Sequence, residues 1–79
     1  MGRIRKKITN DSGYVLVYKP EHPYSNGIGY VREHRLVMES YLGRYLNEEE
    51  VVHHINHIKT DNRIENLEVV NKRDHLKKY

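Results

Sequence analysis

The chain contains no cysteine among its 79 residues. This absence excludes a disulfide framework and also the paired-cysteine zinc sites that often stabilise small domains. A metal ion would therefore have to be held by histidine or by oxygen ligands. The sequence also lacks any apolar run near the ~20 residues of a membrane span, and Met1–Asn10 is basic without the apolar stretch that a signal peptide needs. We expect a cytoplasmic protein with no membrane partner.

Positive charge is in modest excess, with 14 lysines and arginines against 11 acidic residues and a net charge of +3. Much of it lies near the two ends of the chain, while acidic residues gather at Glu48–Glu50. Two basic ends could straddle a phosphate backbone. Basic termini are also common in soluble proteins, and lysines near a helix C-terminus complement the helix dipole. Charge alone therefore leaves a nucleic-acid partner and a merely solvated surface equally open.

A chain of this length forms one domain at most. Its first part predicts three segments, which are a basic, mobile arm over residues 1–12, a strand over Tyr14–Tyr18 and a turn-rich loop over Pro20–Gly29. Over the next segment, Val31, Arg35, Met38 and Leu42 recur at helical spacing, and Gly43 follows as a C-cap. We expect residues 13–50 to form a scaffold in which this helix packs.

Residues 51–79 predict a β-β-α unit. Val51–Ile55 has the β-branched character of a strand, and Leu67–Val70 is a second strand that could return antiparallel after a polar loop. Asn71 is then a good N-cap, with Asp74 three residues later, for a helix that runs to the end of the chain. The expected fold class is α+β, a small single domain with an N-terminal strand and scaffold helix followed by the β-β-α unit.

Three histidines of this unit, His53, His54 and His75, lie where they could form a site. Adjacent residues on a strand point to opposite faces, so His53 and His54 are expected to have different tasks. His53 lies on the face suited to pack against the final helix, which carries His75 near its start. These two could bind one metal ion and leave it open to water and phosphate. His54 would then be free to act as a general base, because an imidazole titrates near pH ~6.5.

Asn66, just before the second strand, could pin the loop against the first strand or hold the region around His54, and loop pinning is the favoured role. Taken singly, each of these residues favours a simpler role. A buried histidine usually packs and hydrogen-bonds, and an asparagine usually caps a turn. On this ground His34 and Arg35 are assigned a bridging hydrogen bond or a packing role in the scaffold helix and are left out of the site.

Together, these residues resemble a known family. Val51-Val-His-His-Ile-Asn56, Asp61-Asn-Arg-Ile-Glu-Asn-Leu67 and Asp74-His75 look like the HNH homing-endonuclease pattern of phages and bacteria. The resemblance extends upstream over Gly29–Glu39 and Leu42–Arg44. It implies a β-β-α-metal finger that hydrolyses phosphodiester bonds in double-stranded DNA, nicking or cutting it, in a bacterial or phage-infected host cell.

The resemblance also implies roles for particular residues. His54 would be the general base, His53 and His75 the ligands of a single divalent metal ion, and Asn66 the structural central residue. The ion would be Mg²⁺, Mn²⁺, Ni²⁺ or Zn²⁺. One departure is His57, where relatives usually have glycine in a turn that can require a positive φ. We expect His57 to strain the loop or to contact DNA, ahead of serving as an additional metal ligand.

The residues predicted by charge and position to contact DNA are Arg3, Arg5, Lys6, Lys7, Lys59, Arg63, Lys72 and Arg73. A competing interpretation is a non-catalytic DNA-binding module with a structural metal site. Such a site usually has about four protein ligands, and retention of His54 favours the enzyme. A third interpretation is a nuclease that acts within a phage packaging complex or another protein complex. A monomer is the default.

Overall fold

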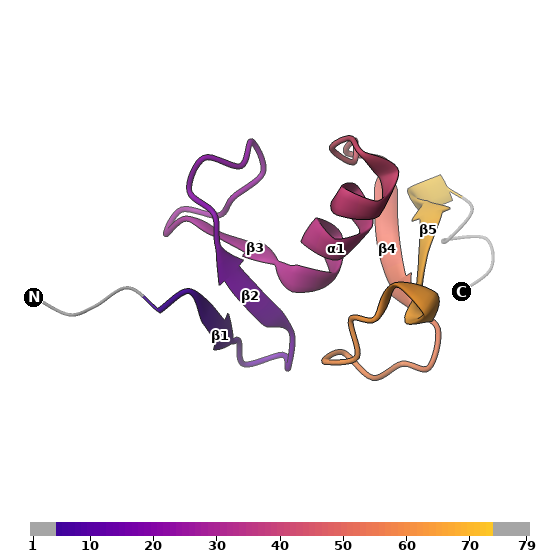
Figure 1. The fold of residues 1–79 in the computed structure, drawn as a ribbon, viewed down its shortest axis with the longest axis horizontal. Helices are drawn as coiled ribbons and strands as arrows, with labels where there is room; N and C mark the ends of the chain where they lie inside the picture. Colours follow the sequence, from indigo (N-terminus) through magenta and orange to yellow (C-terminus); the bar gives the residue numbers. More distant parts are fainter. Residues whose placement is uncertain (1–4, 74–79) are drawn as a thin grey trace, which may run out of the picture.

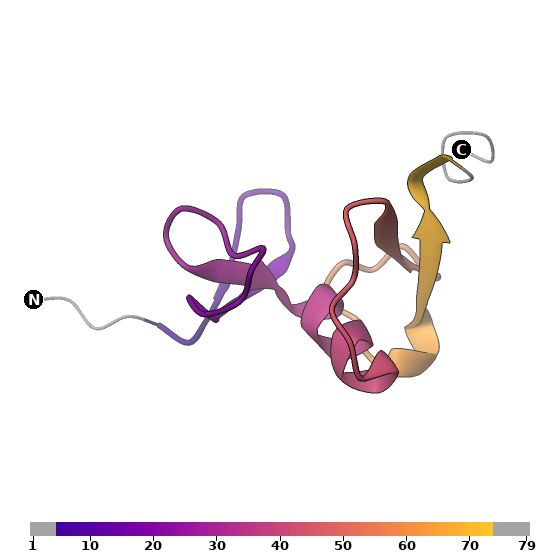
Figure 2. The same ribbon diagram turned by 90° about the horizontal axis from the view of Figure 1, so that it is seen from above.

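The computed structural model describes residues 5–73 of the chain. In this range helix α1 (Glu33–Leu42) lies between two antiparallel sheets, as Figures 1 and 2 show from two directions. The first sheet has the order β1-β2-β3, with the strands Lys7–Thr9, Val15–Tyr18 and Tyr30–Arg32. The second sheet pairs β4 (Glu50–His54) with β5 (Leu67–Asn71), and a 3-10 turn at Ile64–Asn66 precedes β5. The predicted α+β fold class is confirmed. Within residues 5–73 no helix is long and apolar enough to span a membrane.

The N-terminal segment is not a free arm over its whole length. Lys7–Thr9 forms β1, which pairs in antiparallel register with β2. Asn10 closes the turn between these strands, because its side-chain oxygen accepts the backbone N–H groups of Ser12 and Tyr14, each at 3.0 Å. The prediction of a mobile arm over residues 1–12 is therefore wrong for this segment. Its basic composition concealed a short hairpin with local turn chemistry.

The helix begins at Glu33, not at Val31 as the helical spacing of residues 31–42 predicted. Val31 lies in β3, opposite Val17 of β2, and only 3% of its surface is exposed. Its side chain fits the helical period, but the pairing with β2 decides its conformation, and local spacing does not reveal that pairing. The predicted C-cap is confirmed. Gly43 has a left-handed conformation with φ 72° and donates its N–H to the Glu39 carbonyl at 2.9 Å.

The predicted hairpin of the C-terminal half is confirmed. β4 and β5 are antiparallel, with His54 opposite Leu67. Asn71 ends β5, and its side-chain oxygen accepts the Arg73 backbone N–H at 2.9 Å, as an N-cap does. The rest of the expected final helix, including His75, lies outside the described residues.

The main apolar core lies between α1 and the second sheet. Its buried members are Met38, Leu46, Val52 and Leu67. Burial alternates along β4, where Val52 and His54 are buried while Val51 and His53 are half-buried. His54 therefore lies on the face that packs toward α1, and His53 lies on the opposite face, as the period of a strand predicts.

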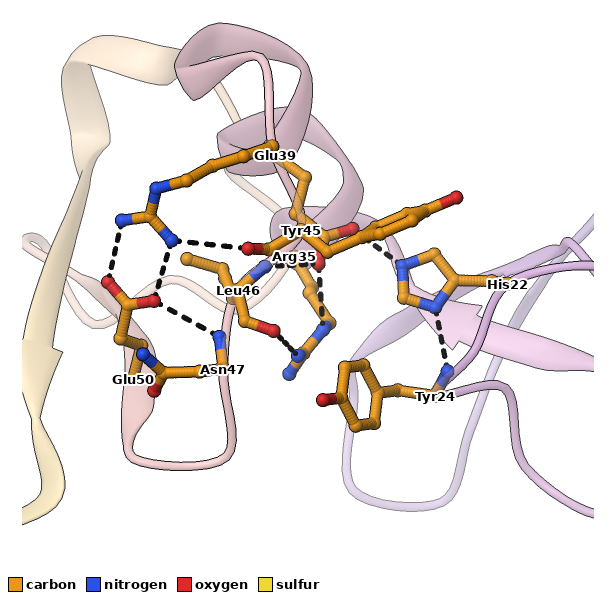
Figure 3. A network of polar contacts seen from close by, with 9 residues as sticks. His22, Tyr24, Arg35, Glu39, Tyr45, Leu46, Asn47 and Glu50 are labelled. Carbon is orange, nitrogen blue, oxygen red and sulfur yellow. Dashed lines mark hydrogen bonds and ion pairs between the residues drawn. The ribbon is translucent and has the colours of Figure 1, made fainter.

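A buried polar network joins the loop after β2 to α1 (Figure 3). Glu39 accepts hydrogen bonds from Nε2 of His22 at 2.6 Å, from Nε of Arg35 at 3.2 Å and from the Leu46 backbone N–H at 2.9 Å. The Tyr24 backbone N–H donates to Nδ1 of His22 at 3.0 Å, so His22 carries its proton on Nε2. A buried carboxylate needs such partners. Arg35 thus has the scaffold role expected of it.

Candidate functional site beside β4

A cleft of about 350 Å³ opens beside β4. Its lining comes from β4, from the loop that follows it, and from the residue after the β1–β2 turn. The lining residues are Tyr14, Val51, Val52, His53, His54, His57 and Lys59. Although His53 and His54 belong to opposite faces of β4, both reach this cleft, and His57 joins them there.

His54 is held by a chain of polar side chains. Its Nε2 lies 2.6 Å from Oδ1 of Asn62, and Nδ2 of Asn62 donates to Oε1 of Glu33 at 3.0 Å. A carboxylate only accepts hydrogen bonds, so Asn62 must turn its NH₂ group to Glu33 and its oxygen to His54. That oxygen also only accepts, so Nε2 of His54 carries the ring proton and Nδ1 is the basic nitrogen. The partners of His54 therefore select its tautomer.

Glu33, the first residue of α1, is the last member of this series of hydrogen-bonded side chains. Lys7 of β1 forms an ion pair with Oε2 of Glu33 at 2.6 Å. The hydrogen bond from Asn62 and the contact with Lys7 hold the pKa of Glu33 below its usual value. Glu33 is therefore ionised at neutral pH and acts only as an acceptor. Contacts from the first sheet, the helix and the β4–β5 loop thus converge on His54.

The His54 ring also packs against other rings. The His34 ring meets it edge-on with centroids 4.7 Å apart, and the Tyr14 centroid lies 6.2 Å from it. His34 is buried, and its Nδ1 has no hydrogen-bond partner in the described part of the chain. Burial, reinforced by the neighbouring His54 and by arginine charges, lowers the pKa of His34 to about 4. His34 is therefore neutral at neutral pH and adds no positive charge beside His54.

His53 and His57 lie next to each other in the cleft. Their ring centroids are 5.3 Å apart and their planes are inclined by 77°. His57 follows β4 in a turn, where its backbone N–H donates to the His54 carbonyl at 3.1 Å. Its φ is 62°, which confirms the expected positive φ at this position. The other expected ligand, His75, lies outside the described residues, and across residues 5–73 no group of three or more potential metal ligands gathers.

Asn66 organises the loop between β4 and β5. Its side-chain oxygen accepts the Asn56 backbone N–H at 3.1 Å, and its NH₂ group donates to the Asn56 side chain at 2.9 Å and to the Asp61 carbonyl at 2.8 Å. These contacts close the loop on itself around a buried side chain. They correspond to loop pinning, the favoured of the two predicted roles. The asparagine that touches the His54 ring is Asn62 instead.

Two cations flank Tyr14 near the histidines. Lys59 Nζ lies 4.9 Å from the Tyr14 ring centroid, and Cζ of Arg32 lies 4.5 Å from it. Lys59 also donates to the Ser12 carbonyl at 2.7 Å and so ties the β1–β2 turn to the loop after β4. Among the predicted DNA-contacting residues that lie within residues 5–73, Lys59 is the one that lines the cleft.

The other residues predicted to contact DNA have varied surroundings. Lys7 is paired with Glu33, and Arg63 makes two hydrogen bonds to Asp61 at 2.7 and 2.8 Å. The charges of Lys7 and Arg63 are thus partly neutralised within the protein. Both side chains are exposed, as are those of Arg5, Lys6, Lys72 and Arg73. Arg3 lies outside the described residues.

Several neighbours of His54 were not predicted from the sequence. Asn62 lies within the motif Asp61–Leu67, but an asparagine in a polar loop carries no signal that separates turn formation from contact with a histidine. Glu33 and His34 are remote from His54 in sequence, and only the packing of α1 against the second sheet brings them to it. The assignment of His34 to packing is confirmed, and the ring on which it packs is His54.

The chain was compared with known protein families. The family described as HNH endonuclease matches residues 31–77, which is more than half of the chain. The match begins just before α1 and includes both strands of the second sheet, and so contains His34, His53, His54, Asn62 and Asn66. No curated protein and no solved structure matches the chain.

Proposed function

Because this chain belongs to the HNH endonuclease family, we propose that it nicks or cuts double-stranded DNA by metal-dependent hydrolysis of a phosphodiester bond. The observation that carries the proposal is the placement of His54 at the cleft, with its Nε2 engaged by Asn62 at 2.6 Å. A histidine with one nitrogen held as a donor has its other nitrogen prepared to accept a proton. This is the arrangement that general-base catalysis requires.

We assign the general-base role to His54. In the proposed step, Nδ1 of His54 removes a proton from the attacking water, and the ring becomes an imidazolium. The bond from Nε2 to Asn62 persists through this change and supports the positive charge, because Asn62 is oriented by the carboxylate of Glu33. His34 stays neutral, so the developing charge on His54 has no positive neighbour there.

The donor set at the cleft fits a divalent metal ion. His53 is half-buried and lines the cleft beside His57, and neutral imidazoles are good ligands for Mn²⁺, Ni²⁺ and Zn²⁺ and weaker ones for Mg²⁺. We propose that His53 holds the ion together with His75. When bound, the ion stabilises negative charge on the phosphate and on the leaving oxygen.

The proposal gives the surrounding residues supporting roles. Asn66 is a positioning residue, because its bonds to Asn56 and Asp61 fix the loop that presents His57 and Asn62. Lys59 at the cleft is suited to the DNA backbone near the scissile bond, since phosphate contacts fix the register of a nuclease on its substrate.

The proposal is tested with supercoiled plasmid, in EDTA and with added Mg²⁺, Mn²⁺, Ni²⁺ or Zn²⁺. The proteins are the wild type, His54→Ala, His54→Gln and the control Asn47→Ala. The control removes, on an exposed turn, the side-chain oxygen that accepts the Glu49 backbone N–H. We expect the wild type and the control to convert the plasmid to relaxed or linear forms only with metal, and both His54 variants to lose this activity. Unfolding curves are recorded for each variant, because His54 is buried.

Two results would overturn the proposal. If the wild type binds the plasmid but leaves it intact with every metal, the chain is a DNA-binding module rather than a nuclease. If folded His54 variants cleave at the wild-type rate, the general base is another group.

A further inference from the structure

His57 has a backbone conformation that its side chain does not favour. Its φ of 62° lies in the left-handed region, where a residue with a Cβ is less stable than glycine by roughly 1–2 kcal/mol. The neighbouring loop imposes this conformation through the hydrogen bond from its N–H to His54 and through the bonds of Asn66 to Asn56. A strained residue at a cleft is a reason to ask what its side chain contributes.

The side chain of His57 lies where a second imidazole could share an ion with His53. A metal–nitrogen distance of about 2.0–2.1 Å puts the ion about 3.2 Å from each ring centre, so two imidazoles on a tetrahedral ion have centres roughly 5 Å apart. The His53 and His57 centroids are 5.3 Å apart, and both rings line the same cleft. The turn that imposes the positive φ is therefore also the turn that brings the second ring to this distance.

We propose that His57 is a ligand of the metal ion, beside His53, and that it shifts the preference of the site toward ions that favour nitrogen. An added imidazole strengthens binding of Ni²⁺, Zn²⁺ and, less strongly, Mn²⁺, whereas Mg²⁺ takes oxygen ligands and gains little. The inference rests on the proposed metal site of the nuclease. It makes His57 a specificity-determining ligand, a role that the loop strain supports.

The test measures metal binding without DNA. Isothermal titration calorimetry of the full chain with Ni²⁺, Zn²⁺, Mn²⁺ and Mg²⁺ compares the wild type with His57→Gly, His57→Asn and the reference His53→Ala. Both replacements at position 57 tolerate the left-handed conformation, and neither carries an imidazole. Loss of an outer-shell partner of a ligand already weakens metal binding by about 10–100-fold, so we expect at least a tenfold weaker Ni²⁺ and Zn²⁺ affinity. Affinity for Mg²⁺ should stay close to that of the wild type.

Two further measurements make the result specific. The melting temperature of the metal-free His57→Gly variant should equal or exceed that of the wild type, because glycine relieves the strain. The ring-nitrogen NMR signals of His57 should shift on addition of Zn²⁺. The proposal is overturned if the variants bind Ni²⁺ and Zn²⁺ as the wild type does, if the His57 signals do not move, or if the wild type binds none of these ions.

The outcome is separable from that of the proposed function. If His57→Gly cleaves the plasmid and binds metal as the wild type does, the proposed nuclease activity stands and only the role of His57 is rejected. If His57→Gly binds metal more weakly but the wild type never cleaves DNA, His57 is a metal ligand and the proposed nuclease activity is rejected.

Discussion

The contact between Asn62 and His54 predicts a strong effect of a residue that does not touch substrate. Asn62→Ala removes the 2.6 Å contact with Nε2 of His54 and the 3.0 Å contact with Glu33. Two hydrogen bonds at about 0.5–1.5 kcal/mol each amount to roughly 1–3 kcal/mol of orientation energy. Since each 1.36 kcal/mol is tenfold in rate, the cleavage step should slow by about 5–160-fold.

Single-turnover cleavage at saturating DNA measures this step, and the DNA concentration at half-maximal rate measures binding. We expect the rate to fall while that concentration stays close to the wild-type value, because Asn62 orients His54 and lies in the protein network. Glu33→Gln and Glu33→Ala test the series of hydrogen bonds from Glu33 through Asn62 to His54. The amide oxygen of Gln can still accept a hydrogen bond from Asn62, whereas Ala has no acceptor. The glutamine variant should keep most of the activity and the alanine variant should lose as much as Asn62→Ala.

Asn47→Ala again serves as the control for loss of an exposed asparagine. The orienting role of Asn62 is refuted if Asn62→Ala cleaves at the wild-type rate, or if this variant is impaired only in DNA binding. It is also refuted if Glu33→Gln and Glu33→Ala cleave at the same rate, because the orientation of His54 would then not depend on a hydrogen-bond acceptor at position 33.

Two further predictions concern stability. The pKa of His34 is about 4 in the folded state and about 6.5 in the unfolded state. Between these pH values the unfolded state binds more protons than the folded state. The free energy of unfolding should therefore be about 2 kcal/mol lower at pH 5 than well above pH 6.5. Urea unfolding at several pH values compares the wild type with His34→Phe, which has no imidazole to titrate. The free energy of unfolding should depend less on pH in the variant, and an equal dependence in both proteins would contradict the lowered pKa of His34. Leu46→Ala should cost about 2–5 kcal/mol, because Leu46 has 0% of its surface exposed, whereas Leu42→Ala, at 38% exposed, should cost less than about 1 kcal/mol. Equal losses in the two leucine variants would show that Leu46 is not the central core residue.

The β4–β5 hairpin was predictable because its constraints are local. Successive residues of a strand point to opposite faces, which separates His53 from His54 on β4, and the polar residues between the strands form the loop that joins them. The positive φ at His57 and the cap at Gly43 were predictable for the same reason, since each depends on a few adjacent residues. Loop pinning by Asn66 was the favoured role, and its contacts agree with it.

The first sheet and the surroundings of His54 were not predictable in this way. Short strands such as β1 and β3 are stabilised by pairing with β2, and a basic or helix-like local pattern hides that pairing. Charge also misleads when partners are distant in sequence, because Lys7 meets Glu33 and Lys59 meets the Ser12 carbonyl only after folding. The roles proposed for His53, His54 and the DNA-contacting residues stay predictions.

By itself, the sequence determined the family, the hairpin that carries the histidines, and the separation of His53 from His54 on opposite faces of β4. These features follow from residue type and from periods of a few residues. The tertiary structure alone decided which nitrogen of His54 is basic, because that depends on Asn62 and Glu33, which reach His54 from a loop and from the start of a helix. A tautomer is set by the atoms in contact with the ring, and those atoms come together only when α1 packs against the second sheet.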